Sequence, residues 1–178
     1  MRNATDLLVQ YAHYHRDRRN IATHFVGIPM IVFAIGVLLA RASFELMGVT
    51  WTAGWAAAIL ASLWWLSRGR LDLGLATSAV TLGLVALAHE AASGPFGDWL
   101  AWGVSTFVVG WVLQFIGHYY EGRKPAFVDD LVGLLVGPMF VMAEALFAIG
   151  WGKTLREEIE RQAGPTHIRD LKQPVAAR

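Results

Sequence analysis

The chain has 178 residues, of which 55% are hydrophobic and only 16% charged, and its formal net charge is +1. It is more apolar than an ordinary soluble domain, and the near-zero charge gives no reason to expect a nucleic acid as partner. The absence of cysteine excludes disulfides, thiolate metal sites, iron–sulfur clusters and cysteine nucleophiles, so a metal ion would need histidine, carboxylate, backbone or water ligands.

Long uncharged stretches predict an all-α integral membrane helical bundle. They comprise residues 25–40, 46–67, 73–88, 99–117, and 131–143 continued by 145–152. A helix needs about 20 mainly apolar residues to cross roughly 30 Å of hydrocarbon; 46–67 and 99–117 supply this directly, and the first stretch does so when it begins at Asn20. We therefore expect four to five spans, preceded by an N-terminal amphipathic helix.

Tryptophans at the ends of these stretches support the membrane interpretation. Those that open or close the second and fourth stretches are Trp51, Trp55, Trp64, Trp65, Trp99 and Trp102. Indole rings concentrate at the two interfaces of a membrane. A soluble, very apolar bundle could imitate each stretch singly, but not the whole series.

Basic residues predict which ends of the spans face the cytoplasm. They precede the first span, join the second to the third and follow the fourth: Arg16, Arg18, Arg19, Arg68, Arg70, Arg123 and Lys124. Cytoplasmic loops carry an excess of such residues, which places the N-terminus, the 68–70 loop and the 121–130 loop on that side. The membrane would be the inner membrane in a bacterium and the endoplasmic reticulum in a eukaryote.

The last apolar segment conflicts with this topology if it spans fully, because it would export the basic tail 153–178. A glycine–proline pair and Glu144 interrupt it, so we prefer a re-entrant 131–150 segment that keeps the tail on the cytoplasmic side. The membrane-embedded catalytic domain is then residues 1–152. Asp129 and Asp130 are expected to cap the helix that follows them.

Three of the six histidines are candidates for a shared site, because the topology places His15, His24 and His118 at one membrane surface. The others, which are expected to point elsewhere or to be solvated, are His13, His89 and His167. On one unbroken helix His24 would lie about 180° from His15, so the two converge only if the chain breaks near Asn20. Asn20 either caps the new helix or points into the site as a hydrogen-bonding group.

A second polar group ends the fourth span, where Gln114, His118 and Glu121 fall on one helical face. The pair His118 and Glu121 is similar to Glu/His pairs that bind iron inside helical bundles, although a solvated helix end would look the same. Three histidines and a carboxylate without sulfur suit Fe(II) or Zn(II), which ligand type alone does not separate. Glu144 either orients a histidine or lies at the mouth of the re-entrant turn.

Two motifs in these segments resemble the 2-hydroxy fatty acid dioxygenase family. The first, Y-x3-H-x4-N-x3-H-x2-G-x-P, consists of Tyr11, His15, Asn20, His24, Gly27 and Pro29. The second, Q-x2-G-H-x2-E-x-R-x-P-A, consists of Gln114, Gly117, His118, Glu121, Arg123, Pro125 and Ala126. The similarity extends over most of residues 5–150, and the tail after Trp151 lies outside it.

The resemblance implies a membrane Fe(II) enzyme that shortens a 2-hydroxy fatty acid by one carbon with O2 and without 2-oxoglutarate, an α-oxidation of lipid metabolism. Eukaryotic members act in phytosphingosine breakdown. The metal ligands that it implies are His15, His24, His118 and Glu121. Asn20, Gln114 and Glu144 would orient these ligands or contact the substrate, whose alkyl tail would lie among the spans. The oligomeric state, including a homo-oligomer, stays open.

Two other functions compete with this one. A membrane Zn(II) hydrolase acting on a lipid amide or ester would use the same ligands and metal-activated water. A small transporter or scaffold with structural histidines would bind no metal. A di-iron fatty acid hydroxylase is disfavoured, because members of that class resemble one another through about eight clustered histidines and this chain has six.

Overall fold

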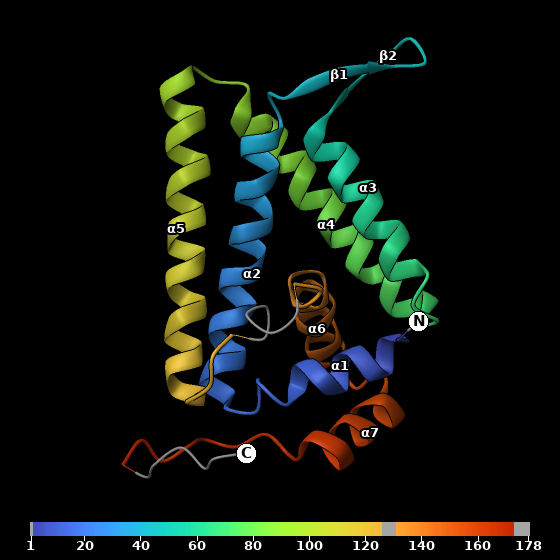
Figure 1. The fold of residues 1–178 in the computed structure, drawn as a ribbon, viewed down its shortest axis with the longest axis vertical. Helices are drawn as coiled ribbons and strands as arrows, with labels where there is room; N and C mark the ends of the chain where they lie inside the picture. Colours follow the sequence, from blue (N-terminus) through green and yellow to red (C-terminus); the bar gives the residue numbers. More distant parts are fainter. Residues whose placement is uncertain (1, 126–130, 173–178) are drawn as a thin grey trace.

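Helices dominate the computed structural model, which describes residues 2–125 and 131–172 (Figure 1). In chain order the elements are α1 (Ala4–Ala12), α2 (Arg18–Leu39), β1 (Ser43–Leu46), β2 (Val49–Thr52), α3 (Ala53–Leu66), α4 (Leu71–Ala92), α5 (Phe96–Glu121), α6 (Gly133–Ala148) and α7 (Lys153–Ala163). The predicted all-α bundle is confirmed, with one small hairpin added. Asp129 and Asp130, expected as helix caps, lie outside the described residues.

Within the described part of the chain, three helices are long and apolar enough to cross a membrane, namely α2, α4 and α5. A fourth span results if α6 and α7, which meet at a bend of 117°, are taken as one broken segment. Large apolar side chains remain exposed along the three long helices, for example Leu75, Val112 and Phe115. Such surfaces suit contact with lipid tails.

The predicted span over residues 46–67 is wrong in its first part. Strands β1 and β2 pair antiparallel there, and only the 14 residues of α3 are helical. Met47 and Gly48 both have positive φ between the paired residues Leu46 and Val49, the conformation of a two-residue hairpin turn that matches strand twist. The third stretch, in contrast, extends beyond its predicted ends into the 22 residues of α4.

The predicted chain break before His24 is present, but it ends earlier than expected. Helix α1 stops at Ala12 and α2 begins at Arg18, with Asp17 as N-cap accepting from the Arg19 N–H at 2.9 Å. The cap is therefore Asp17 and not Asn20. Asn20 lies inside the first turn of α2, where its side-chain amide donates to Tyr14 O and to the Glu121 carboxylate.

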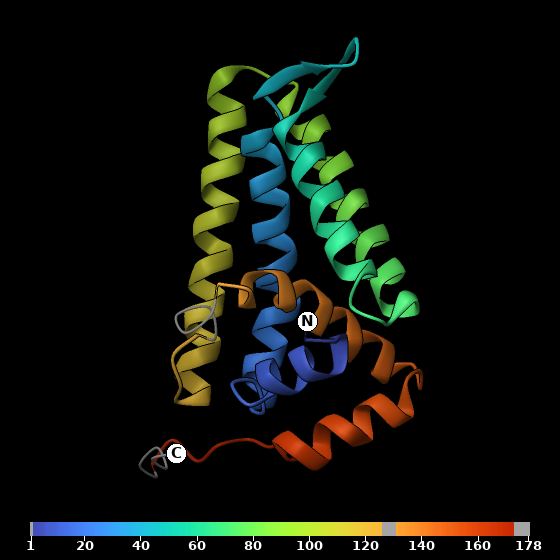
Figure 2. The same ribbon diagram turned by 45° about the vertical axis from the view of Figure 1, so that its right-hand side comes forward.

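Helices α2 and α5 run antiparallel in close contact along their length (Figures 1 and 2). Glycines of α5 allow this approach: a methyl group at Gly110 would lie 2.7 Å from Ile31 Cγ1 and 3.0 Å from the Gly27 carbonyl oxygen. A methyl group at Gly117 would overlap Thr23 and Asn20. Small residues bring membrane helices together in this way, and here they bring His24 and His118 within reach of each other.

Helices α1, α6 and α7 gather at the end of the bundle where α2 begins and α5 ends (Figures 1 and 2). Their shared apolar core includes Leu8 of α1, Phe140 of α6 and Ile159 of α7, and Trp65 of α3 donates its indole N–H to Leu135 O at 2.8 Å. Helix α6 occupies only this part of the bundle, and α7 lies beneath it beside α1; the bent pair forms either a re-entrant segment or one broken span. The Ala4 N–H also binds Arg68 O, so the 68–70 loop joins the same end.

Candidate metal site

Three histidines from three segments meet inside this end of the bundle. His15 comes from the loop between α1 and α2, His24 from α2 and His118 from α5, and they are 0%, 1% and 6% exposed. One ring nitrogen of each lies within 4.8 Å of the others. The structure thus brings together three of the four predicted metal ligands.

Backbone carbonyl groups fix the orientation of two of these rings. His15 Nδ1 lies 2.7 Å from Tyr11 O, and His24 Nδ1 lies 2.9 Å from Asn20 O. Because a carbonyl oxygen only accepts, each Nδ1 must carry the hydrogen, which leaves each Nε2 with a lone pair in the neutral ring. The two Nε2 atoms nevertheless face each other at 3.0 Å.

A cation between the two lone pairs removes their repulsion. Protonation of one ring is disfavoured, because burial first, and then the neighbouring His24 and His118, lower the pKa of His15 well below its usual range. A metal ion suits the pair better, since both Nε2 lone pairs face the space between the rings and neutral imidazole is a common ligand of Fe(II) and Zn(II). The arrangement therefore suits a metal bound by imidazole.

In the part of the chain that the structure describes, several buried polar side-chain atoms of α2 and α5 have no hydrogen-bond partner. Among the described residues, buried side-chain atoms without a hydrogen-bond partner include Asn20 Oδ1, Gln114 Nε2 and His118 Nδ1. Buried polar groups in folded proteins almost always have hydrogen-bond partners. Several unpaired polar atoms in one region therefore indicate a bound ion, ligand or water molecule. A nitrogen-rich, sulfur-free ligand set of this kind suits Fe(II) or Zn(II).

Glu121, the fourth predicted ligand, has a different set of partners. Its carboxylate accepts from the Arg16 N–H at 3.0 Å, from the Asp17 N–H at 2.8 Å and from the Asn20 side chain at 3.1 Å. Both oxygens are engaged in these bonds, and Glu121 lies outside the group of converging ring nitrogens. In the structure it anchors the loop that carries His15 to the end of α5.

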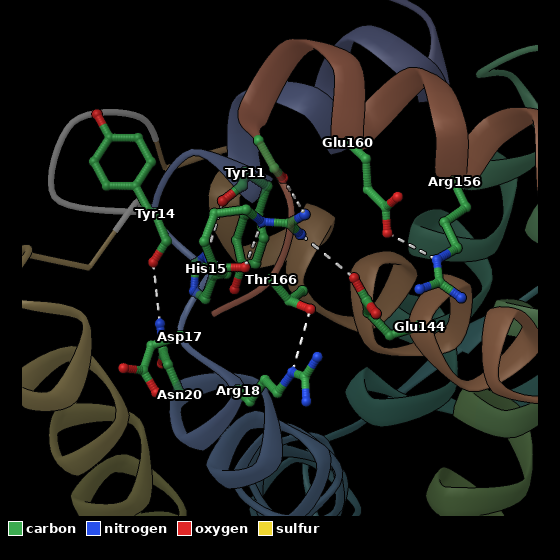
Figure 3. Close-up of polar contacts among 12 residues, drawn as sticks. Tyr11, Tyr14, His15, Asp17, Arg18, Asn20, Glu144, Arg156, Glu160 and Thr166 are labelled. Carbon is green, nitrogen blue, oxygen red and sulfur yellow. Dashed lines mark hydrogen bonds and ion pairs between the residues drawn. The ribbon is translucent and has the colours of Figure 1, made fainter. Parts of the chain in front are cut away.

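Asn20 and Glu144 reach the histidines through other groups. The Asn20 side chain donates to Tyr14 O at 3.0 Å as well as to Glu121, so it ties the loop to α5 (Figure 3). Glu144 of α6 lies 3.5 Å from the Arg16 guanidinium, which donates in turn to His15 O at 2.9 Å (Figure 3). Both residues are placed to support the loop rather than to touch a shared ligand.

An elongated apolar cavity of about 260 Å³ begins at His24 and His118. Gln114, one helical turn before His118 and 5% exposed, lines its polar end. The remaining wall comes mainly from α2, α5 and α6: Ile28, Ile31, Val32, Ile35, Phe107, Trp111, Leu134 and Pro138. Phe107 precedes His118 by eleven residues, so the cavity follows α5 for about 16 Å.

A family model described as 2-hydroxy-palmitic acid dioxygenase Mpo1-like matches residues 1–65 and 73–149. The chain belongs to the Mpo1-like family. A curated relative, the 2-hydroxy-palmitic acid dioxygenase MPO1 of Saccharomyces cerevisiae, is 30% identical over 153 residues, which cover 84% of this chain and 83% of the relative. No solved structure matches the chain.

The matched part of this Mpo1-like chain contains the three histidines, Gln114 and Glu121, all of which the sequence singled out. Sequence reasoning missed Tyr11 as a ring stacked on His15, with centroids 4.0 Å apart, and gave Arg16 only a topological role. It also treated the residues after 153 as a polar tail, whereas α7 and the segment after it pack against the site. The amphipathic pattern of Leu155, Ile159 and Ala163 was the available signal for that packing.

Proposed function

We propose that this chain is an Fe(II)-dependent membrane dioxygenase that shortens 2-hydroxy fatty acids by one carbon with O2. The observation that carries the proposal is a buried three-histidine group with facing lone pairs beside an apolar cavity that His24 and His118 line. Membership of the Mpo1-like family and the name of the yeast relative support the reaction and the substrate class.

The cavity suits an amphipathic substrate. The alkyl tail would lie along Ile28, Ile31 and Ile35 of α2 and the facing side of α5, where each buried CH2 contributes about 0.8 kcal/mol. The carboxylate and 2-hydroxyl group would lie at the polar end. There the unpartnered amide nitrogen of Gln114 would donate a hydrogen bond to one of these oxygens.

His15, His24 and His118 would hold the metal ion, and their carbonyl partners would keep the coordinating nitrogens pointing inward. Bound iron supplies open coordination positions for substrate and O2 and the electrons for O2 activation. Glu121 would hold the His15 loop through two backbone N–H groups. The apolar wall would keep water from the bond between C1 and C2.

The test is turnover by the purified protein. Protein prepared anaerobically in detergent and loaded with Fe(II) is expected to consume O2 and convert 2-hydroxypalmitate into the acid one carbon shorter. His24→Ala should abolish both signals, whereas His167→Ala, at an exposed histidine, should leave them intact. Absence of product and O2 uptake in iron-loaded protein would refute the proposal. Zinc in the protein and O2-independent release of fatty acid from a lipid ester or amide would favour the hydrolase instead.

A further inference from the structure

The segment that follows α7 lies against the loop that carries His15. Here residues 164–170 are called the tail strap. The His167 N–H donates to Arg16 O at 2.9 Å and the Arg18 N–H donates to His167 O at 2.9 Å, which forms a short parallel bridge at Asp17. The strap therefore satisfies two backbone groups immediately after His15 that no helix supplies with a partner.

Side chains of the loop bind the strap on either side of this bridge. The buried Arg16 guanidinium donates to Gly164 O at 3.1 Å, and Arg18 Nε lies 3.5 Å from Thr166 Oγ1 (Figure 3). Arg16 also donates to His15 O, so one guanidinium joins the strap to the backbone of a candidate ligand. The contact is thus continuous from the end of α7 to the histidine loop.

Arg169 joins the strap to the helix that carries His118. Its guanidinium donates to Tyr120 O at 2.8 Å and to Tyr119 O at 3.2 Å, the carbonyl groups at the end of α5. A cation is favoured there because the last carbonyl groups of a helix lack partners and carry partial negative charge. The Arg169 N–H also donates to Asp17 at 2.8 Å, so Arg169 connects the ends of two ligand-bearing helices.

Asp17 is the point where these connections meet. Its fully buried carboxylate accepts from the backbone and side chain of Arg19 and from the Arg169 N–H. Arg19 in turn donates to Arg169 O at 2.8 Å. The start of α2, one turn before Ile21 and two before His24, is held between α5 and the strap.

We propose that the tail strap positions His15 against His24 and His118, with the His167 backbone and the Arg169 side chain as positioning groups. The inference rests on the proposed metal site. The strap lies beyond residue 149, where the match to the family model ends, so this chain would complete the support of its site with a segment the family model does not include. Loss of groups that orient metal ligands typically costs 10- to 100-fold in metal affinity.

A matched pair of variants isolates the backbone contribution. His167→Pro and His167→Ala both remove the imidazole, but only the proline removes the N–H that binds Arg16 O. Measured by chelator competition in the full-length protein, the dissociation constant for Co(II) or Fe(II) is expected to rise at least about tenfold in His167→Pro relative to His167→Ala. Equal constants in the two variants would overturn the inference.

A second pair tests the side chain and decides the matter if the proline variant does not fold. Arg169→Ala removes the bridge to Tyr119 and Tyr120, whereas Arg161→Ala removes an exposed arginine of α7 that pairs with Glu158. We expect weaker metal binding and an altered Co(II) absorption spectrum only in Arg169→Ala. A fall in the thermal midpoint of the metal-free protein without a change in affinity or spectrum would show a purely structural role and would contradict the proposal.

Amide hydrogen exchange separates failure of this inference from failure of the proposed function. In metal-free protein, peptides covering residues 13–20 should exchange faster in His167→Pro than in His167→Ala, while peptides of α4 stay unchanged. Equal exchange rates at residues 13–20 in the two variants would refute the positioning role of the strap, whatever the measured metal affinity. Faster exchange at residues 13–20 in His167→Pro, together with wild-type protein that binds no metal, would refute the proposed metal site while leaving the contact between the strap and the loop intact.

Discussion

Residue by residue, the site is ordered by backbone groups as much as by side chains. His15, His24 and His118 could be selected from the sequence, because spacing and topology place them at one membrane surface. The partners of Glu121 could not be selected in this way. They are N–H groups of a loop whose path depends on packing between α1, α5 and the strap.

Glu121→Gln tests whether this residue binds metal or holds the loop. An amide has one acceptor oxygen in place of two, so it cannot satisfy the N–H groups of Arg16 and Asp17 together with Asn20. We expect Fe(II) affinity to fall about 10- to 100-fold while some binding remains. Glu157→Gln, at an exposed position of α7, is the matched control. Complete loss of binding, equal to that of His118→Ala, would identify Glu121 as a ligand.

Gln114→Leu tests the polar end of the cavity. Its amide nitrogen is buried without a partner among the described residues, and the residue lines the cavity, so its removal should leave iron content unchanged. A hydrogen bond to a charged group contributes about 1.5–3 kcal/mol, so kcat/KM for 2-hydroxypalmitate should fall about 10- to 100-fold. Steady-state kinetics of iron-quantified protein would show this. Unchanged kcat/KM would exclude Gln114 from substrate contact.

At the scale of elements, the hydropathy pattern predicted which segments contain helices but not the residues at which those helices begin. The 46–67 stretch carries no charge, yet the turn at Met47 and Gly48 and the strand-forming residues around it make a hairpin. The break before α2 was predicted from the need to bring His15 and His24 together. Its position was not, because Asp17 is held by Arg169, which is 152 residues away.

The length of the cavity is a property of the paired helices α2 and α5, and Ile35→Trp tests it. Ile35 lines the cavity far from the histidines, so a larger ring there should obstruct long alkyl chains and spare short ones. The ratio of kcat/KM for 2-hydroxypalmitate to that for 2-hydroxyoctanoate is expected to fall about tenfold, or about 1.4 kcal/mol. Ile116→Trp, on a residue equally exposed at 41% but outside the cavity, is the control. An equal ratio in both variants would rule out this path for the tail.

At the scale of the whole molecule, one end of the bundle carries the site, the N-terminal helix, α7 and most of the basic residues. The opposite end carries the hairpin and the loop before α5 (Figure 1). The sequence predicted this polarity from its charge distribution. It did not predict that residues after 153 would return to cover the site, because that packing depends on contacts far apart along the chain.

The proposed orientation predicts opposite labelling of two equivalent serines. Ser67 and Ser93 each follow the last residue of a helix and are exposed, at the site end and the hairpin end respectively. In sealed, right-side-out cells or vesicles, Ser93→Cys should react with an impermeant maleimide, whereas Ser67→Cys should react only after permeabilisation. The absence of native cysteine leaves no background. The reverse pattern would place the site on the non-cytoplasmic face.

Equilibrium binding of Fe(II) under anaerobic conditions tests the central claim most directly. The facing lone pairs of His15 and His24, with His118 beside them, predict one iron per wild-type chain. His15→Ala, His24→Ala and His118→Ala should each reduce the affinity by at least about tenfold, whereas His167→Ala should retain it. The account would be contradicted by wild-type protein that binds no iron. It would also be contradicted if all three variants bound one iron with wild-type affinity.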